Sequence, residues 1–148
     1  MSDVDLDSYE LLFSQDGHRT YQLCPGALLS IHDGDMTDVV MRPLLETLDT
    51  IDGPVVAYVA DLAALGRVTK QARRVAADHP NRIGVEGVMG RVYLVNASVF
   101  ARAAGTMLLA VSRFSSRRET DLLFRKTLPQ AIDEAMAFAR ETLERLER

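Results

Sequence analysis

Few side chains in this sequence are placed to do acid–base chemistry, and Asp61 is the best of them. It ends the apolar run Pro54–Asp61, which is long enough for a strand buried on both faces. Open α/β sheets bind ligands at the carboxyl ends of their strands, near a change in strand order, and we expect Asp61 at such a place. Asp61 is therefore a loop or ligand candidate, and the best candidate for a general base. Its carboxylate could instead accept hydrogen bonds from backbone N–H groups of the following loop. We favour this structural role over a catalytic or ligand-binding one.

The histidines and the single cysteine do not form a recognisable catalytic or metal-binding pattern. His18, His32 and His79 share no metal-ligand spacing, and Cys24 alone cannot complete a structural zinc site. Cys24 and His32 could act as nucleophile and base only if the fold brought them together, so we expect Cys24 to be a small core residue. We therefore predict no catalytic residue, no metal and no cofactor.

Three glycines also fail to form a nucleotide-binding motif. Gly84, Gly87 and Gly90 lack the spacing, the preceding strand and the following helix of a dinucleotide fingerprint. We expect them to allow a bend or a close approach between chain segments.

Composition and charge limit the class of protein. The 148 residues suit one domain, with residues 1–7 frayed, and the formal net charge of −4 argues against nucleic-acid binding. One cysteine excludes an internal disulfide, and the acidic start Met1–Asp5 is unlike a secretory signal. No apolar run reaches the roughly 20 residues that cross a bilayer. We expect a cytoplasmic protein without a transmembrane segment.

The basic residues gather in the middle and in the later part of the chain. This distribution fits either a solvated surface of mixed charge or a basic face for an acidic partner or a phosphate-bearing ligand. The two clusters are Arg67, Lys70, Arg73, Arg74, Arg82 and Arg91, and then Arg113, Arg117, Arg118, Arg125 and Lys126.

The first third of the chain predicts an antiparallel meander followed by a helix. Strands are expected at 9–13, 20–24 and 27–31, with Asp16-Gly17 as a hairpin turn. Asp33-Gly34-Asp35 predicts a turn and a helix start, with Asp35 as the cap. Pro43 conflicts with a straight helix, so we expect a kink there or a helix that begins near it. The apolar stripe of this helix is Val40, Leu44, Leu48 and Ile51.

The rest of the chain alternates strands and helices. After the strand Pro54–Asp61 we expect a connection over 62–68, and Thr69 then caps a helix that ends near His79. Strands at 91–96 and 122–126 enclose a helix at 97–112, and Thr127 caps the last helix. Its predicted buried stripe is Ile132, Ala135, Met136, Ala139, Leu143 and Leu146. The fold class is α/β: a mixed sheet of about five to six strands with an antiparallel N-terminal lead, and helices packed on both faces.

This order of elements resembles that of STAS-type domains, and most closely the SpoIIAA-like branch of stand-alone bacterial proteins. The resemblance rests on the lead, on residues 55–62, on the helix start Thr69-Lys70-Gln71-Ala72-Arg73 and on the closing segment 124–131, and it covers about residues 8–145. It implies regulation by protein–protein binding. Related anti-sigma-factor antagonists carry a phosphorylatable Ser or Thr at the start of the helix after the central strand. Thr69 matches that position, although the Asp-Ser-Ser-Gly type of motif is absent, so Thr69 is a regulatory candidate as well as a cap.

The expected helix at 97–112 is apolar on nearly all its faces. A sheet covers only one face, so a loop, a second subunit, another partner or a lipid-like ligand must cover the other. The outward stripe predicts an interface of Ala101, Gly105, Leu109 and Ser112. A basic rim of Arg113, Arg117 and Arg118 follows it.

Three functions remain open on these grounds. The first is a non-enzymatic regulatory or scaffold module that binds protein, including by self-association as a homo-oligomer. The second is a binder of a small apolar or lipid-like ligand. The third is an enzyme that uses Asp61.

Overall fold

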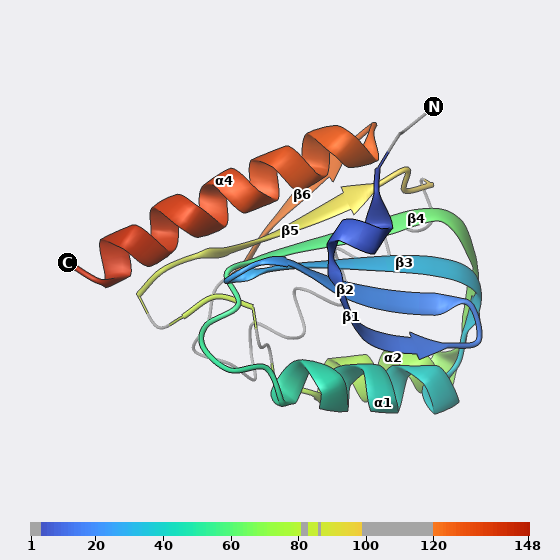
Figure 1. The fold of residues 1–148 in the computed structure, drawn as a ribbon. Helices are drawn as coiled ribbons and strands as arrows, with labels where there is room; N and C mark the ends of the chain where they lie inside the picture. Colours follow the sequence, from blue (N-terminus) through green and yellow to red (C-terminus); the bar gives the residue numbers. More distant parts are fainter. Residues whose placement is uncertain (1–3, 81–82, 86, 99–119) are drawn as a thin grey trace.

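The computed structural model describes residues 4–80, 83–85, 87–98 and 120–148. The described residues form one sheet with helices on both of its faces (Figure 1). The elements in chain order are a 3-10 turn η1 (Leu6–Ser8), β1 (Glu10–Gln15), β2 (His18–Cys24), β3 (Ala27–Met36), α1 (Asp38–Asp49), β4 (Ala57–Val68), α2 (Lys70–Asp78), β5 (Gly90–Val95), β6 (Thr120–Arg125) and α4 (Leu128–Leu146).

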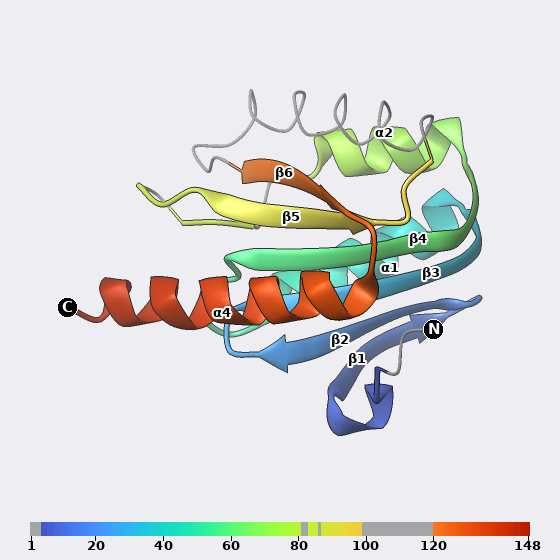
Figure 2. The same ribbon diagram turned by 90° about the horizontal axis from the view of Figure 1, so that it is seen from above.

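The predicted fold class is confirmed. The sheet has six strands in sequential order, antiparallel from β1 to β3 and parallel from β3 to β6. Helices α1 and α2 cover one face, and α4 lies across the other (Figures 1 and 2). Because β3, β4 and β5 are parallel neighbours in chain order, right-handed crossovers place both of their helices on the same face.

The N-terminal hairpin forms where it was predicted. Asp16 and Gly17 both have positive φ, 50° and 86°, as a two-residue turn of the mirror type requires. A Cβ atom at Gly17 would lie 2.5 Å from the carbonyl oxygen of Asp33, so this turn accepts only glycine without a shift of β3.

Two predicted loops are strand instead. Asp33-Gly34-Asp35 was expected to start a helix and 62–68 to be a connection, but β3 and β4 pair with each other as far as Met36 and Val68. The β3–β4 ladder shifts register twice, between Ile31 and Asp33 and between Gly34 and Met36, and at each shift β4 contains one residue more than β3. Asp35 does not cap α1. Its Oδ1 accepts the backbone N–H of Arg67 at 2.7 Å, and the missing side chain of Gly66 leaves room for that carboxylate.

Helix α1 begins before its proline. It starts at Asp38, five residues ahead of Pro43, so the expected start near Pro43 is wrong. Pro43 has no N–H for the carbonyl of Val39, and the side chain of Gln15 in β1 donates to that oxygen instead, at 3.2 Å. Val40, Leu44 and Leu48 of the predicted stripe are buried, whereas Ile51 lies beyond the end of α1 and is half-buried.

The predicted strand Pro54–Asp61 is buried on both faces from Val55 to Ala60, but its bounds differ, because β4 begins at Ala57 and continues to Val68. Val56, Ala57 and Val59 have no exposed surface. Val56 and Val59 belong to the core under α4, which includes Ile132, and Tyr58 belongs to the core on the opposite face. One member of the predicted α4 stripe is wrong: Leu146 is 45% exposed, because the last turn of α4 extends beyond the strands (Figure 2).

Candidate functional site

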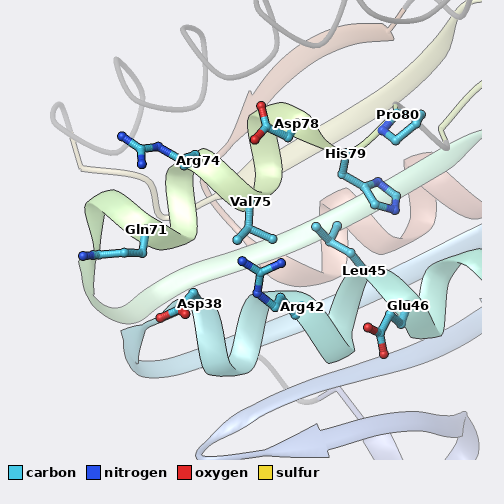
Figure 3. Close-up of a pocket in the computed structure, with 10 residues that line it drawn as sticks. All are labelled: Asp38, Arg42, Leu45, Glu46, Gln71, Arg74, Val75, Asp78, His79 and Pro80. Carbon is cyan, nitrogen blue, oxygen red and sulfur yellow. The ribbon is translucent and has the colours of Figure 1, made fainter.

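A groove lies between α1 and α2 (Figure 3). It has a volume of about 420 Å³ and is partly open to solvent. Its lining comes from both helices and from the residues that follow α2: Asp38, Arg42, Leu45, Glu46, Gln71, Arg74, Val75, Asp78, His79 and Pro80.

Packing between the two helices sets the position of this groove. Ala72 of α2 is fully buried and lies in one apolar cluster with Val40 and Leu44 of α1. A small side chain at 72 lets the helices approach closely at that level. Leu45 and Val75, which also line the groove, are half-buried and give it an apolar component.

Charged side chains of both signs surround this apolar part. Arg42 lies between the two helices, and Arg74 and Gln71 stand on α2 (Figure 3). Glu46 and Asp78 are carboxylates nearer the C-terminal ends of the helices. At that end the Nε2 atom of His79 lies 2.9 Å from Oδ2 of Asp49, which links the end of α2 to the end of α1.

A second polar cluster is buried in the sheet and was not predicted. The Nδ1 atoms of His18 and His32 lie 3.0 Å apart, and Nε2 of His18 lies 2.8 Å from the carbonyl oxygen of Asp35. A carbonyl only accepts, so Nε2 of His18 carries a proton, and one of the two Nδ1 atoms donates to the other. Burial, and to a lesser extent the neighbouring His18, lower the pKa of His32 to about 4. The ring of His32 is therefore neutral near pH 7.

Three hydroxyl groups extend this cluster across the sheet. Oγ1 of Thr20 lies 2.6 Å from Oγ of Ser30, and Ser30 is also hydrogen-bonded to the hydroxyl of Tyr58. Burial raises the pKa of Tyr58. The hydroxyls satisfy one another within the core, as buried polar groups must. We interpret the cluster as a structural network, because its members bond to one another and none of them lines the groove between α1 and α2.

Asp61 does not lie where it was expected. It is in the middle of β4, paired with Ile31 and Val95, and not at the end of the strand. The strand order is sequential, so there is no change of order beside it. Its Oδ1 accepts the N–H of Ala63 at 3.1 Å, the kind of backbone bond that the structural interpretation predicts.

The structure separates Cys24 from His32. Cys24 faces Ala27 at one end of the β2–β3 ladder, and His32 faces His18 at the other. Cys24 packs against the core under α4, and burial raises the pKa of its thiol, which keeps it protonated.

Two smaller predictions agree with the geometry. Oγ1 of Thr69 accepts the N–H of Ala72 at 3.1 Å, so Thr69 caps α2. A Cβ atom at Gly90 would lie 2.8 Å from the backbone nitrogen of Gly84, which is the close chain approach expected of these glycines.

Several predicted site residues lie outside the described residues. These are the interface stripe Ala101, Gly105, Leu109 and Ser112 and the basic rim Arg113, Arg117 and Arg118, and both assignments stay predictions. In the part of the chain that the structure describes, no three His, Cys, Asp or Glu side chains gather as metal ligands, and no helix is long and apolar enough to span a bilayer.

Comparison with known proteins yields neighbours among solved structures alone. No family model and no curated protein matches the chain. Among solved structures, it is similar to an uncharacterised protein from Shewanella loihica PV-4, described as a DUF3478 family member with a SpoIIAA-like fold. The two are 18% identical, the alignment covers 86% of this chain and 91% of the other, and the TM-score is 0.49. The description of that neighbour names the same type of fold as the sequence resemblance does.

Proposed function

We propose that this chain is a non-enzymatic regulatory module that binds a segment of a partner protein in the groove between α1 and α2. The observation that carries the proposal is the composition of that groove. Leu45 and Val75 supply apolar contact area, and charged side chains of both helices surround them. An apolar centre with a polar rim is the usual composition of a protein–protein interface.

The shape of the groove supports a polypeptide over a small apolar ligand. Pockets for small ligands bury most of the ligand surface, whereas this groove between two helices is partly open to solvent. A partner segment laid between two helices is a recurring form of peptide recognition. The lipid-like ligand was inferred from the helix expected at 97–112, which lies outside the described residues, so the described residues supply no separate support for it.

Thr69 is the regulatory position that we propose for this module. It caps α2 and directly precedes Lys70, close to the groove residues Gln71 and Arg74. A phosphoryl group on its hydroxyl would add negative charge beside these cations and would compete with an acidic partner for them.

Site-specific photo-crosslinking in extracts of the source cells tests this proposal. A photoreactive amino acid at the exposed groove residue Gln71 should form an adduct with a distinct protein. The matched control carries the same amino acid at Glu141, exposed on α4 on the opposite face of the sheet, and should not form it.

Two further arms link the adduct to the groove and to Thr69. Val75→Arg places a long charged side chain in the groove and should abolish the adduct. Thr69→Asp should weaken it, whereas Thr69→Ser, which keeps the cap, should not. The same adduct from Glu141, or an adduct that survives Val75→Arg, would show that this groove is not the docking site.

A further inference from the structure

The two helices that form the groove carry their charges in an unusual order. Both run in the same direction, because each connects parallel neighbouring strands of one sheet. Cations occupy the segment just before α2 and its first half: Arg67, Lys70, Arg73 and Arg74. Arg42 adds a cation from α1, and the carboxylates Glu46, Asp49 and Asp78 lie toward the C-terminal ends.

This order does not stabilise the helices. A helix is stabilised by negative charge near its N-terminus and by positive charge near its C-terminus. Helix α2 has no acidic residue in its first turn and no basic residue in its last, and α1 also has no basic residue in its last turn. Asp38, in the first turn of α1, is the exception, and it has a stabilising role there. Departures from such local stabilising patterns are expected at the functional or strained sites of a protein.

The cations also lack partners within the fold. Among the described residues, none of Arg42, Arg67, Lys70, Arg73 and Arg74 forms an ion pair with a carboxylate. The carboxylates at the other end differ, since Asp49 is engaged by His79 at 2.9 Å. Arg42 and Arg74 line the groove, and Arg67, Lys70 and Arg73 stand just outside its lining. Asp38 adds one carboxylate at this end, whereas Glu46 and Asp78 line the other end, so the end at the start of α2 is the more positive one.

We propose that the partner segment carries acidic side chains over the first half of α2 and a basic side chain toward Glu46 and Asp78. This inference rests on the proposed function and adds the chemistry and direction of the partner. Charge complementarity of this kind fixes the register of a bound peptide and speeds its association. Glu46 and Asp78 disfavour an anionic membrane or a nucleic-acid backbone, because a continuous row of phosphates would meet carboxylates at one end.

Peptide selection on the intact protein tests this charge pattern. Displayed random peptides of about 12 residues, roughly three helical turns, would be selected on the wild-type chain and counter-selected on Val75→Arg. Enriched peptides should place two or more Asp or Glu residues at one end and Lys or Arg at the other. Binding of one such labelled peptide, followed by fluorescence polarisation, should weaken about tenfold in Arg74→Glu and in Lys70→Glu.

Matched controls separate the surface from general charge effects. Arg140→Glu, an exposed reversal on α4, should leave the affinity unchanged. A peptide with its acidic residues changed to Lys should lose affinity for wild type and regain it for the double variant Lys70→Glu/Arg74→Glu.

Other outcomes identify other occupants or remove the inference. Peptides that bind in the groove but lack an acidic cluster would overturn the proposed charge pattern. They would leave the proposed function in place, because the crosslinking at Gln71 tests that function independently. Absence of any groove-dependent peptide would overturn the inference. Binding of phosphatidylserine vesicles that needs Lys70 and Arg74 but survives Val75→Arg would assign the cations to a membrane. A doubled mass in light scattering that Arg74→Glu abolishes would assign the groove to a second copy.

Discussion

At the scale of single residues, the feature that needs most explanation is a buried pair of histidines. His18 is fully buried and His32 is 7% exposed, and each uses Nδ1 to bond the other. The bond needs one Nδ1 atom without a hydrogen, so it is lost once both rings carry a proton on Nδ1. The network therefore contributes a stability that depends on pH.

We predict that the free energy of unfolding falls as the pH is lowered from about 6.5 to about 4. The unfolded chain binds a proton at His32 near its ordinary pKa of 6.5, whereas the native state binds it only near the lowered pKa of about 4. Protonation thus favours the unfolded state, by roughly 3 kcal/mol once the pH is below both values. This contribution is fully present above pH 6.5.

Urea unfolding at several pH values measures this effect. His32→Gln should have a flatter dependence on pH than wild type, because its amide does not titrate. His79→Gln, which changes a more exposed histidine, is the matched control and should follow wild type. Parallel curves for His32→Gln and wild type would show that the buried pair does not titrate as described.

At the scale of elements, the contact between β1 and α1 explains how a helix tolerates an internal proline. Pro43 leaves the carbonyl of Val39 without its helical donor, and Gln15 in β1 supplies one from its side chain. Thr47 donates its hydroxyl to the carbonyl of Pro43 at 2.9 Å, which adds a bond at the same turn. The edge strand and the first helix are therefore joined by a bond that exists because of the proline.

We predict that the effect of Gln15 depends on Pro43. Gln15→Ala should cost about 1 kcal/mol in wild type, since it leaves the carbonyl of Val39 without its side-chain donor. In a Pro43→Ala background the helix supplies its own N–H to that carbonyl, so Gln15→Ala should cost little.

A double-mutant cycle from chemical denaturation gives the coupling between the two positions. Ser14→Ala, at the neighbouring position of β1, is the control and should show no coupling to Pro43→Ala. Equal costs of Gln15→Ala in both backgrounds would show that the side-chain bond does not replace the helical one.

At the scale of the whole molecule, the sheet is buried between α4 on one face and α1 with α2 on the other (Figure 1). The parallel strand β4 lies at its centre, between β3 and β5. This burial is the main source of stability, because the hydrophobic effect scales with the apolar area removed from water.

We predict that Val56→Asp prevents folding. Val56 is fully buried in the core under α4, and an unpaired carboxylate there costs several kcal/mol, comparable to the total stability of a domain. Val39→Asp is the matched control, because Val39 is 65% exposed on α1 and should tolerate the change. Thermal unfolding by circular dichroism compares them, and a cooperative transition of Val56→Asp within a few degrees of wild type would contradict the buried position.

The sequence alone determined those elements whose turn, capping and hydrophobic patterns agree with the tertiary contacts that the elements make. The Asp16-Gly17 hairpin, the buried apolar run at 55–60, the Thr69 cap and the capped last helix were predictable, because turn chemistry, hydrophobic period and capping act over a few residues. Asp33-Gly34-Asp35 misled the prediction, since pairing with β4 overrides a local preference for a turn.

Only the tertiary structure decided which distant residues meet. The β2–β3 ladder shifts register between Gln22 and Cys24. A two-residue turn at Pro25-Gly26 with regular pairing from Cys24–Ala27 would have placed His18 opposite Asp33, and the shift places it opposite His32. The groove likewise exists because two crossover helices pack on the same face of the sheet. The sequence of α1 or α2 alone does not indicate which helix will lie beside it. A contact between segments depends on register and layer, which are properties of the assembled sheet.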